Sequence, residues 1–269
     1  MLKKTLIWII AIIITIGAAI YQRKTGPTYP KKAEISLNGK TINFQLPRSY
    51  VSGKDCPVEI KITDSNTKGS LFYKRFPVDE PYIEIKFKYE NDTLKSFLPG
   101  QPPAGKLAYY LVLKDQKKET RIAKNNPVII RFKGEVPVYA LMPHIILIFL
   151  AMLLSNVTGL MAIWKIPGFR LYTLITFIVL IAGGLIFGPI VQKFAFGEYW
   201  TGIPKGWDLT DNKTLIASIG WLTAVIGNWK KDRPYLSLVA SILMLIIFLI
   251  PHSFLGSELN YTTGEIKTG

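Results

Sequence analysis

The stretch from Val138 to Trp164 decides the class of this protein, and it reads VYALMPHIILIFLAMLLSNVTGLMAIW. It contains no Asp, Glu, Lys or Arg over 27 residues. A helix crosses the apolar core of a bilayer with about 20 such residues, so this stretch predicts a membrane-spanning helix. The whole chain has a mean hydropathy of +0.26 and is 49% hydrophobic, which is typical of a protein that lies partly in a membrane.

Four other apolar runs accompany this stretch: Thr5–Tyr21, Leu171–Phe194, Thr214–Trp229 and Tyr235–Leu255. The first of them follows two lysines, a start shared by cleaved signal peptides and uncleaved anchors. Gly17-Ala18-Ala19 would suit cleavage, but the length of the run favours an anchor. We therefore expect a transmembrane signal anchor at residues 1–21 and a four-helix transmembrane domain at residues 138–255.

Basic residues in the short loops indicate the orientation of these helices. Residues 1–4, 165–170 and 230–234 are all positive, whereas the charges of residues 193–213 balance. Positive loops stay in the cytoplasm. The sequence thus predicts a multi-pass protein of the inner membrane with a cytoplasmic N-terminus. Residues 22–137 and a C-terminal tail at 256–269 are expected outside the cytoplasm.

Residues 22–137 have the two-residue period of β-strands. Ile83, Ile85, Phe87 and Tyr89 alternate with charged residues, and similar alternation occurs at 42–46 and 58–62. Turn signals such as Asn38-Gly39 separate the runs. Several short strands of this kind predict an antiparallel all-β sandwich inserted between the anchor and the helical bundle.

The segment Leu98–Tyr110, LPGQPPAGKLAYY, resembles the proline-rich approach to a late strand of fibronectin type III-like and immunoglobulin-like domains. The resemblance covers only this segment and implies a sandwich of that kind, although the Cys–Trp–Cys core of true immunoglobulin domains is missing. Residues 100–107 also nearly match a phosphate-binding loop. Leu107 replaces the Ser or Thr that holds magnesium, and a strand pattern follows instead of a helix, so no nucleotide is expected there.

The net charge of +15 is spread along the strands and at helix ends, so nucleic acid is not expected as a partner. Residues 22–137 contain 22 Lys and Arg against 12 Asp and Glu. This excess favours charged, solvated strand faces over attraction to an acidic partner or anionic headgroups. The single cysteine, Cys56, excludes an internal disulfide.

Candidate site residues gather at the predicted outer face of the helices. The two histidines of the chain, His144 and His252, each follow a proline, and each lies about one turn inside a predicted helix end. The loop 197–213 belongs to the same face, and Thr210 or Asp211 is expected to cap the helix after it. This loop contains Trp200, Trp207, Asp208 and Asp211.

These residues leave several hypotheses open. His144 and His252 with Asp208 and Asp211 are suited to ligate a divalent metal, and the two imidazoles are suited to ligate haem b. The same histidines with Trp200 and Trp207 would instead suit a quinone or lipid headgroup. In the simplest alternative, carbonyl groups or water satisfy both histidines and the loop is structural.

No motif of a nucleophile, a zinc protease or a paired-carboxylate enzyme occurs in the sequence. The sequence therefore favours a non-enzymatic subunit or accessory protein of a membrane complex. Its expected partners are the lipid bilayer and other membrane or extracytoplasmic proteins. The alternative is a redox or metal-dependent membrane enzyme, or an electron-transfer subunit, in which His144 and His252 hold haem or a metal.

Overall fold

The structure, a computed structural model, describes residues 2–37, 39–115, 118–251 and 256–267. The chain forms two compact units. The first contains the N-terminus up to Pro27 and the segment Val136–Gly256. The second contains Thr28–Glu135 together with Ser257–Lys267, so most of the segment expected as a C-terminal tail folds with the strands of this unit.

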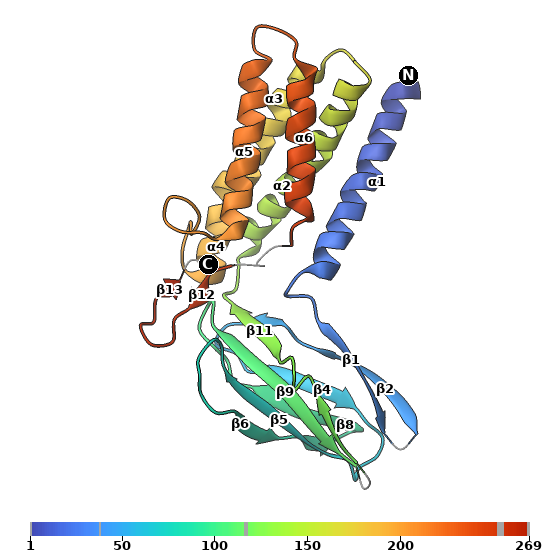
Figure 1. The fold of residues 1–269 in the computed structure, drawn as a ribbon, viewed down its shortest axis with the longest axis vertical. Helices are drawn as coiled ribbons and strands as arrows, with labels where there is room; N and C mark the ends of the chain where they lie inside the picture. Colours follow the sequence, from blue (N-terminus) through green and yellow to red (C-terminus); the bar gives the residue numbers. More distant parts are fainter. Residues whose placement is uncertain (1, 38, 116–117, 252–255, 268–269) are drawn as a thin grey trace. The chain divides into compact units, whose positions relative to one another are not determined.

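The first unit is a bundle of helices (Figure 1). Its elements are α1 (Leu2–Thr25), α2 (Val138–Ile163), α3 (Phe169–Leu180), the π-helical η1 (Ile181–Phe187), α4 (Gly188–Phe196), α5 (Leu209–Gly227) and α6 (Pro234–Leu249). The elements α3, η1 and α4 follow one another without a break and form one rod of 28 residues. The described part of the bundle therefore consists of five rods.

Three rods are long and apolar enough to cross a membrane: α1, α2 and the rod Phe169–Phe196. Helix α6 is apolar but has only 16 residues. Helix α5 has 19 residues, and its first turns contain Asp211, Asn212 and Lys213, which lower its hydropathy. The chain thus combines candidate membrane helices with β-sheets, as predicted, and length and composition alone support three spans where the sequence suggested five.

Hydroxyl and amide side chains connect the helices of the bundle. Asn156 of α2 donates to Thr15 Oγ1 of α1 over 3.0 Å, and the hydroxyls of Thr173 in α3 and Ser237 in α6 lie 2.8 Å apart. Small residues allow the close approach: a Cβ at Gly184 would lie 2.6 Å from Thr214 Cγ2 of α5. Such contacts hold helices together where no water competes.

The basic segments of the bundle meet at one of its ends. Ile7, near the start of α1, is buried in a cluster with Met161, Ile166 and Phe169 of the α2–α3 connection. Arg170 Nε lies 2.6 Å from a carboxylate oxygen of Asp232 in the α5–α6 loop. The N-terminal lysines and the two positive loops noted in the sequence therefore share one end of the bundle.

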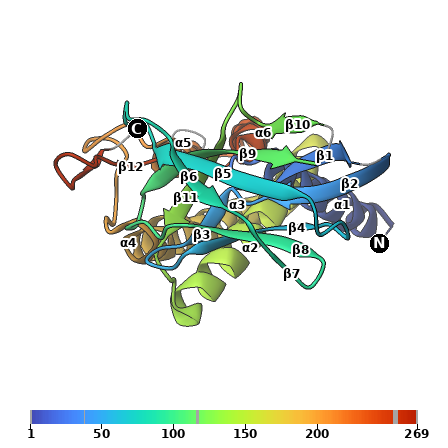
Figure 2. The ribbon, with the colours of Figure 1, turned by 90° about the horizontal axis from the view of Figure 1, so that it is seen from below.

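The second unit is made of short strands: β1 (Lys31–Leu37), β2 (Lys40–Leu46), β3 (Ser49–Val51), β4 (Cys56–Lys61), β5 (Lys68–Arg75), β6 (Ile83–Lys86), β7 (Lys88–Glu90), β8 (Thr93–Leu98), β9 (Lys106–Lys114), β10 (Glu119–Ile122), β11 (Val128–Lys133), β12 (Glu258–Leu259) and β13 (Ile266–Lys267). The largest sheet has the order β3-β11-β9-β5-β6, with β10 also paired to β9. Strands β4-β8-β7 form a second sheet, and β1-β2 a hairpin. Figure 2 shows β7 and β8 side by side and apart from β5 and β9.

The sheets enclose one shared apolar core. Leu46, Val58, Leu98 and Tyr109, from four different strands, are all buried in it. The prediction of an all-antiparallel sandwich was wrong in one respect, because β3 pairs with β11 in parallel. Strand β11 is the last strand of this sheet in chain order, and it lies between the edge strand β3 and strand β9.

The alternating run Ile83–Tyr89, which predicted one strand, serves two sheets. Its first half pairs with β5 as β6, and its second half pairs with β8 as β7. The backbone N–H of Phe87 donates to the carbonyl of Gly69 at the change-over. A Cβ at Gly69 would lie 3.0 Å from the Phe87 ring and 2.7 Å from Leu113, so glycine makes room for the crossing. Alternation in the sequence cannot reveal such a change of sheet.

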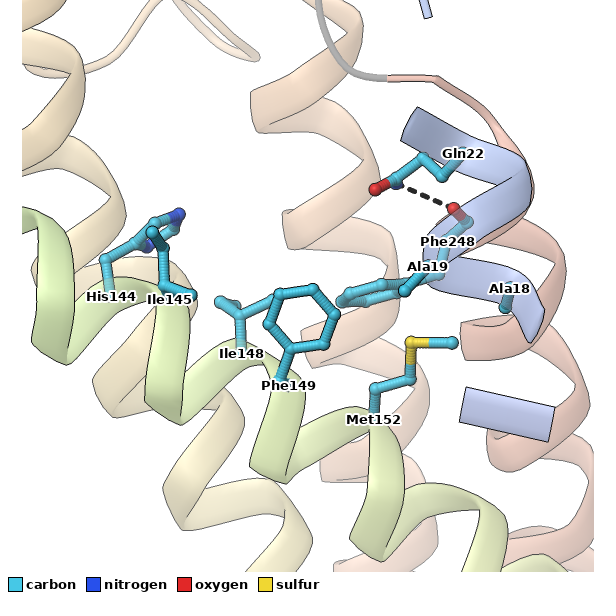
Figure 3. Close-up of a pocket in the computed structure, with 9 residues that line it drawn as sticks. All are labelled: Ala18, Ala19, Gln22, His144, Ile145, Ile148, Phe149, Met152 and Phe248. Carbon is cyan, nitrogen blue, oxygen red and sulfur yellow. Dashed lines mark hydrogen bonds between the residues drawn. The ribbon is translucent and has the colours of Figure 1, made fainter. Parts of the chain in front are cut away.

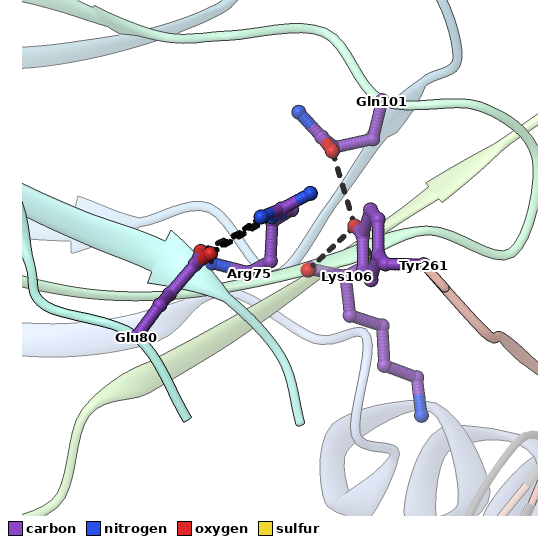
Figure 4. A network of polar contacts seen from close by, with 5 residues as sticks. All are labelled: Arg75, Glu80, Gln101, Lys106 and Tyr261. Atoms are coloured by element: carbon purple, nitrogen blue, oxygen red, sulfur yellow. Dashed lines mark hydrogen bonds and ion pairs between the residues drawn. The ribbon is translucent and has the colours of Figure 1, made fainter. Parts of the chain in front are cut away.

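The C-terminal segment is tied to the second unit through Tyr261 (Figure 4). The Tyr261 hydroxyl accepts from the backbone N–H of Lys106 over 2.9 Å. Two acceptors are close enough for the hydroxyl to donate to: the carbonyl of Lys106 at 2.9 Å and the amide oxygen of Gln101 at 3.1 Å. Arg75, which is held by the carboxylate of Glu80, lies over the Tyr261 ring at 5.4 Å. Burial raises the pKa of Tyr261 to about 12.

Candidate functional site

His144 lies where two irregular helices of the bundle meet. It follows Pro143, which lacks the N–H of a regular helix and so weakens hydrogen bonding in the first turns of α2. Its Nδ1 atom lies 2.8 Å from the carbonyl oxygen of Gly183, which is in the π-helical η1. A carbonyl can only accept, so Nδ1 carries a hydrogen, and in the neutral imidazole Nε2 is then an acceptor.

The opposite helix is shaped to receive this imidazole. The carbonyl of Gly183 also accepts the N–H of Gly188, five residues on, as the π-helical pattern requires. A Cβ at Gly183 would lie 2.8 Å from Leu147 Cβ of α2, and one at Gly188 would lie 3.7 Å from the imidazole Cε1 of His144. Gly183 therefore lets α2 approach closely enough for His144 to reach the backbone, whereas a Cβ at Gly188 would make only an ordinary contact.

A pocket of about 200 Å³ lies beside His144, between α1, α2 and α6 (Figure 3). Ala18 and Ala19 of α1 leave the space, and the polar members of its lining are His144 and Gln22. The Gln22 amide nitrogen donates to the carbonyl of Phe248 over 2.7 Å and reaches that of Ile250 at 3.4 Å. The other described residues of the lining are apolar: Ile145, Ile148, Phe149, Met152 and Phe248.

The two aspartates of the predicted metal site hold the loop before α5 in place. Asp208 accepts from the backbone N–H of Thr210 over 2.8 Å and caps α5, so the prediction of Thr210 or Asp211 as the cap was wrong. The buried Oδ2 of Asp211 accepts from the backbone N–H groups of Thr201 and Gly202 over 2.6 and 3.0 Å. It also accepts from the Thr201 hydroxyl and from the amide of Gln192.

The fold of this loop depends on a close approach at Gly202. A Cβ there would lie 2.7 Å from Asp211 Cβ and 2.7 Å from the side-chain oxygen of Asn212. That oxygen accepts from the backbone N–H of Ile203 over 2.8 Å. Lys213, which follows, is buried and donates to the carbonyl of Ile250 over 2.8 Å. The loop thus encloses its own charged and amide groups and joins α5 to the end of α6.

The two tryptophans of the predicted site have different surroundings from His144. The Trp200 indole donates to the carbonyl of Ile203 over 3.0 Å, and Trp207 is 72% exposed. Neither of them lines the pocket beside His144. His252 lies outside the described residues.

Among the described residues, no group of three or more His, Cys, Asp and Glu side chains is placed to hold a metal ion. A haem, metal or quinone site shared by His144 and His252 therefore stays a prediction. The visible spectrum and metal content of the purified protein test it.

A second hollow, of about 360 Å³, lies on the exposed face of the large sheet in the second unit. Its floor includes Phe72 and Tyr110, whose rings stack at 4.9 Å with an angle of 4°. The acidic groups in it are already bound, since Ser70 donates to Glu84 over 2.6 Å and Arg121 to Glu119 over 2.9 Å. Its other cationic residues are Lys68, Lys114 and Lys124.

Sequence reasoning missed Gln22 and the C-terminal Tyr261. Gln22 is the first polar side chain after the apolar run of the anchor, and that position was its only signal. Ala18 and Ala19, two residues of the stretch that resembles a cleavage site, line the pocket. Tyr261 carried no signal, because its partner Lys106 is 155 residues away in the chain.

The fold defines a class: a protein with candidate membrane-spanning helices and a separate β-sheet unit. No protein-family model matches the chain. Searches of curated proteins and of solved structures likewise find no match.

Proposed function

We propose that this chain is a membrane-embedded accessory subunit that crosses the bilayer five times and binds its partner outside the cytoplasm. The argument for five crossings rests on the second unit. Residues before α2 and residues after α6 fold together in it, which supports a placement of both on one side of the membrane. In that placement the number of crossings between them is even.

Helices α5 and α6 complete that even number. The spans α2 and Phe169–Phe196 contribute two crossings, so α5 and α6 either both cross or both stay outside. They share a buried apolar cluster with α2 and α3 that includes Met152, Leu180, Trp221 and Met244. At about 1.5 Å per residue their lengths are about 28 and 24 Å, close to the roughly 30 Å of a bilayer core. This packing supports a hairpin that crosses with the other two rods.

The charges of the bundle support a cytoplasmic N-terminus. The N-terminal lysines and both positive loops share one end of the bundle, where Arg170 pairs with Asp232. Positively charged short loops remain on the cytoplasmic side. The second unit, after one crossing by α1, then lies outside the cytoplasm.

The lysine-rich hollow of the large sheet is the observation that carries the binding role. Its acidic residues, Glu84 and Glu119, already accept hydrogen bonds from neighbouring side chains. A stacked aromatic pair forms its floor, and the lining also contains Lys68, Lys114 and Lys124. Aromatic residues supply contact area in protein interfaces, and the surplus positive charge attracts an acidic surface. We infer an acidic face of a membrane or extracytoplasmic protein as the partner.

Site-specific photocrosslinking of the full-length protein in its own membrane tests this role. A photoreactive phenylalanine at Tyr110 should capture one protein, and the added substitution Lys114→Glu should abolish the adduct. Phe97, which is 51% exposed on β8 of the other sheet, is the matched control position and should capture nothing. Equal adducts at both positions, or an adduct that survives Lys114→Glu, would contradict the proposal.

We also propose that the second unit is a variant of the fibronectin type III-like or immunoglobulin-like sandwich. The core that its sheets share supports this relationship. The parallel pair β3–β11 departs from an all-antiparallel arrangement and is the feature in which it would differ.

A further inference from the structure

Hydrogen bonds around the pocket between α1, α2 and α6 decide which polar atoms of its lining remain as donors or acceptors. The Nδ1–H of His144 donates to the carbonyl of Gly183, so in the neutral imidazole the remaining ring nitrogen, Nε2, is an acceptor. The Gln22 amide nitrogen is used by the carbonyl of Phe248, so the remaining Gln22 atom, Oε1, is also an acceptor. Figure 3 shows this oxygen pointing away from the Phe248 carbonyl. Among the described residues of the lining, both polar side chains therefore present acceptors, which a ligand with donor groups would satisfy.

Two irregular helical segments beside the pocket hold His144 in the tautomer that carries its hydrogen on Nδ1. Pro143 and the π-helical η1 come from different rods, yet both act on the same imidazole. A π-helical segment is costly and often marks a functional position. Here it places the Gly183 carbonyl where it fixes the His144 tautomer. Nε2 is therefore an acceptor because the Gly183 carbonyl binds Nδ1–H, and the residue type alone would not decide this.

The remaining walls define the rest of the ligand. They are aliphatic side chains and the aromatic rings of Phe149 and Phe248, with a volume of about 200 Å³ that suits a single ring. The pocket lies among α1 and α2, two of the rods that are apolar enough to span a membrane, so its ligand arrives from the lipid phase.

We propose that this pocket binds the headgroup of a membrane quinol, the reduced form of an isoprenoid quinone. The two hydroxyls of a quinol donate to acceptors such as Nε2 of His144 and Oε1 of Gln22, and its ring packs against the phenylalanines. The oxidised quinone offers only acceptors and would face acceptors in the pocket. The pocket therefore discriminates between the two redox states. The inference uses the membrane placement but not the binding role of the second unit, so each can fail alone.

Calorimetric titration of the full-length protein in detergent, under anaerobic conditions, tests this preference. Decylubiquinol should bind about three- to tenfold more tightly than decylubiquinone, which is the effect of one or two hydrogen bonds. Equal affinity for the two forms, or tighter binding of the quinone, would overturn the proposal. Phosphatidylglycerol, whose headgroup also has hydroxyls, serves as the competing lipid. If it displaces the quinol at equal concentration, the pocket is a general lipid site and the proposal fails.

Three variants locate the binding site. His144→Asn keeps an amide donor near the Nδ1 position for the Gly183 carbonyl and removes the acceptor at Nε2, and Gln22→Leu removes Oε1. Each should weaken decylubiquinol about three- to tenfold and leave decylubiquinone nearly unchanged. Ala19→Phe should fill the pocket and abolish both. Gln45→Leu, at an exposed amide of β2 in the second unit, should change neither affinity. Unchanged quinol binding in Gln22→Leu and Ala19→Phe sinks the proposal even if the His144 variant does not fold.

Discussion

At the scale of single residues, the contrast between Asp211 in the first turn of α5 and Glu198 in the loop before α5 shows what burial does. Asp211 is 6% exposed and accepts four hydrogen bonds, two of them from backbone groups, whereas Glu198 is exposed. Removing this carboxylate takes the acceptor away from the buried backbone N–H groups of Thr201 and Gly202, and a buried donor that loses its acceptor costs about 1–3 kcal/mol. Asp211 is therefore a structural residue of the bundle.

We predict that Asp211→Ala lowers the stability of the full-length protein by about 2–4 kcal/mol, since the donors of Thr201 and Gly202 lose their acceptor. Thermal unfolding in detergent should show a melting temperature several degrees lower. Glu198→Ala, the control, should change it by about a degree or less, because exposed carboxylates contribute little. Similar melting temperatures for the two variants would show that the loop does not depend on Asp211.

A second residue-scale prediction concerns Cys56, which is 1% exposed on β4. Burial raises the pKa of its thiol to about 12, so the reactive thiolate is scarce at neutral pH. N-ethylmaleimide at pH 8 should leave the native protein unlabelled and should label it after denaturation. A cysteine placed at Glu59, which faces outward on the same strand, should react at once in a Cys56→Ala background. Rapid native labelling of Cys56 would show that this part of the core opens readily.

At the scale of elements, the C-terminal segment acts as an integral part of the second unit. Tyr261 bonds to both backbone groups of Lys106 at the start of β9, and Lys106 is further paired with Glu258. Burial lowers the pKa of Lys106, and its partner Glu258 opposes this. A Cβ at Gly105 would lie 3.1 Å from the Tyr261 hydroxyl, so the turn before β9 is fitted to this side chain.

Tyr261→Phe should therefore loosen the start of β9. We expect hydrogen exchange of the amides near Lys106 to become about five- to thirtyfold faster, which corresponds to about 1–2 kcal/mol of lost local stability. Tyr82→Phe is the control, since that ring packs edge-on against Tyr110 and its variant keeps this contact. Exchange that is unchanged in the Tyr261 variant would mean that the segment rests on the sheet without stabilising it.

The same residue predicts a dependence on alkaline pH. The folded unit keeps the Tyr261 phenol protonated up to a pKa of about 12, whereas its ordinary value is 10.0. The unfolded chain therefore releases this proton first, and the contribution of Tyr261 to stability, complete below pH 10, is lost as the pH rises toward 12. Exchange near Lys106 should accelerate over this range beyond the intrinsic effect of pH in the wild type. It should do so less in Tyr261→Phe.

At the scale of the whole molecule, the topology follows from which segments fold together. A reporter that is active only outside the cytoplasm should be active when fused after Gly134 and silent when fused after Pro167. Fusion after Asp232 should also be silent if α5 and α6 cross as a hairpin. Activity after Asp232 would place both helices outside the membrane, and the reverse of the first two results would invert the whole arrangement.

The sequence by itself determined the kinds of element and their order. Long apolar runs can only be satisfied as helices in a bilayer, and the alternation of Ile42, Phe44 and Leu46 requires a strand with one buried face. Both patterns are local, so composition alone reveals them. The positive segments of the sequence likewise predicted that they lie on one side of the bundle, and in the structure they share one of its ends.

Tertiary structure alone decided the rest, because those features join residues that are far apart in the chain. The run Ile83–Tyr89 divides between two sheets only because Gly69 and Leu113 pack against its middle. Asp208 and Asp211 are residue types of a metal site, yet backbone N–H groups of the first turn of α5 and of the loop before it donate to their oxygens. The acceptor state of His144 depends on a π-helical carbonyl 39 residues away. The sequence specifies the type of each side chain, but the fold determines which partner it meets and hence whether it donates, accepts or binds a ligand.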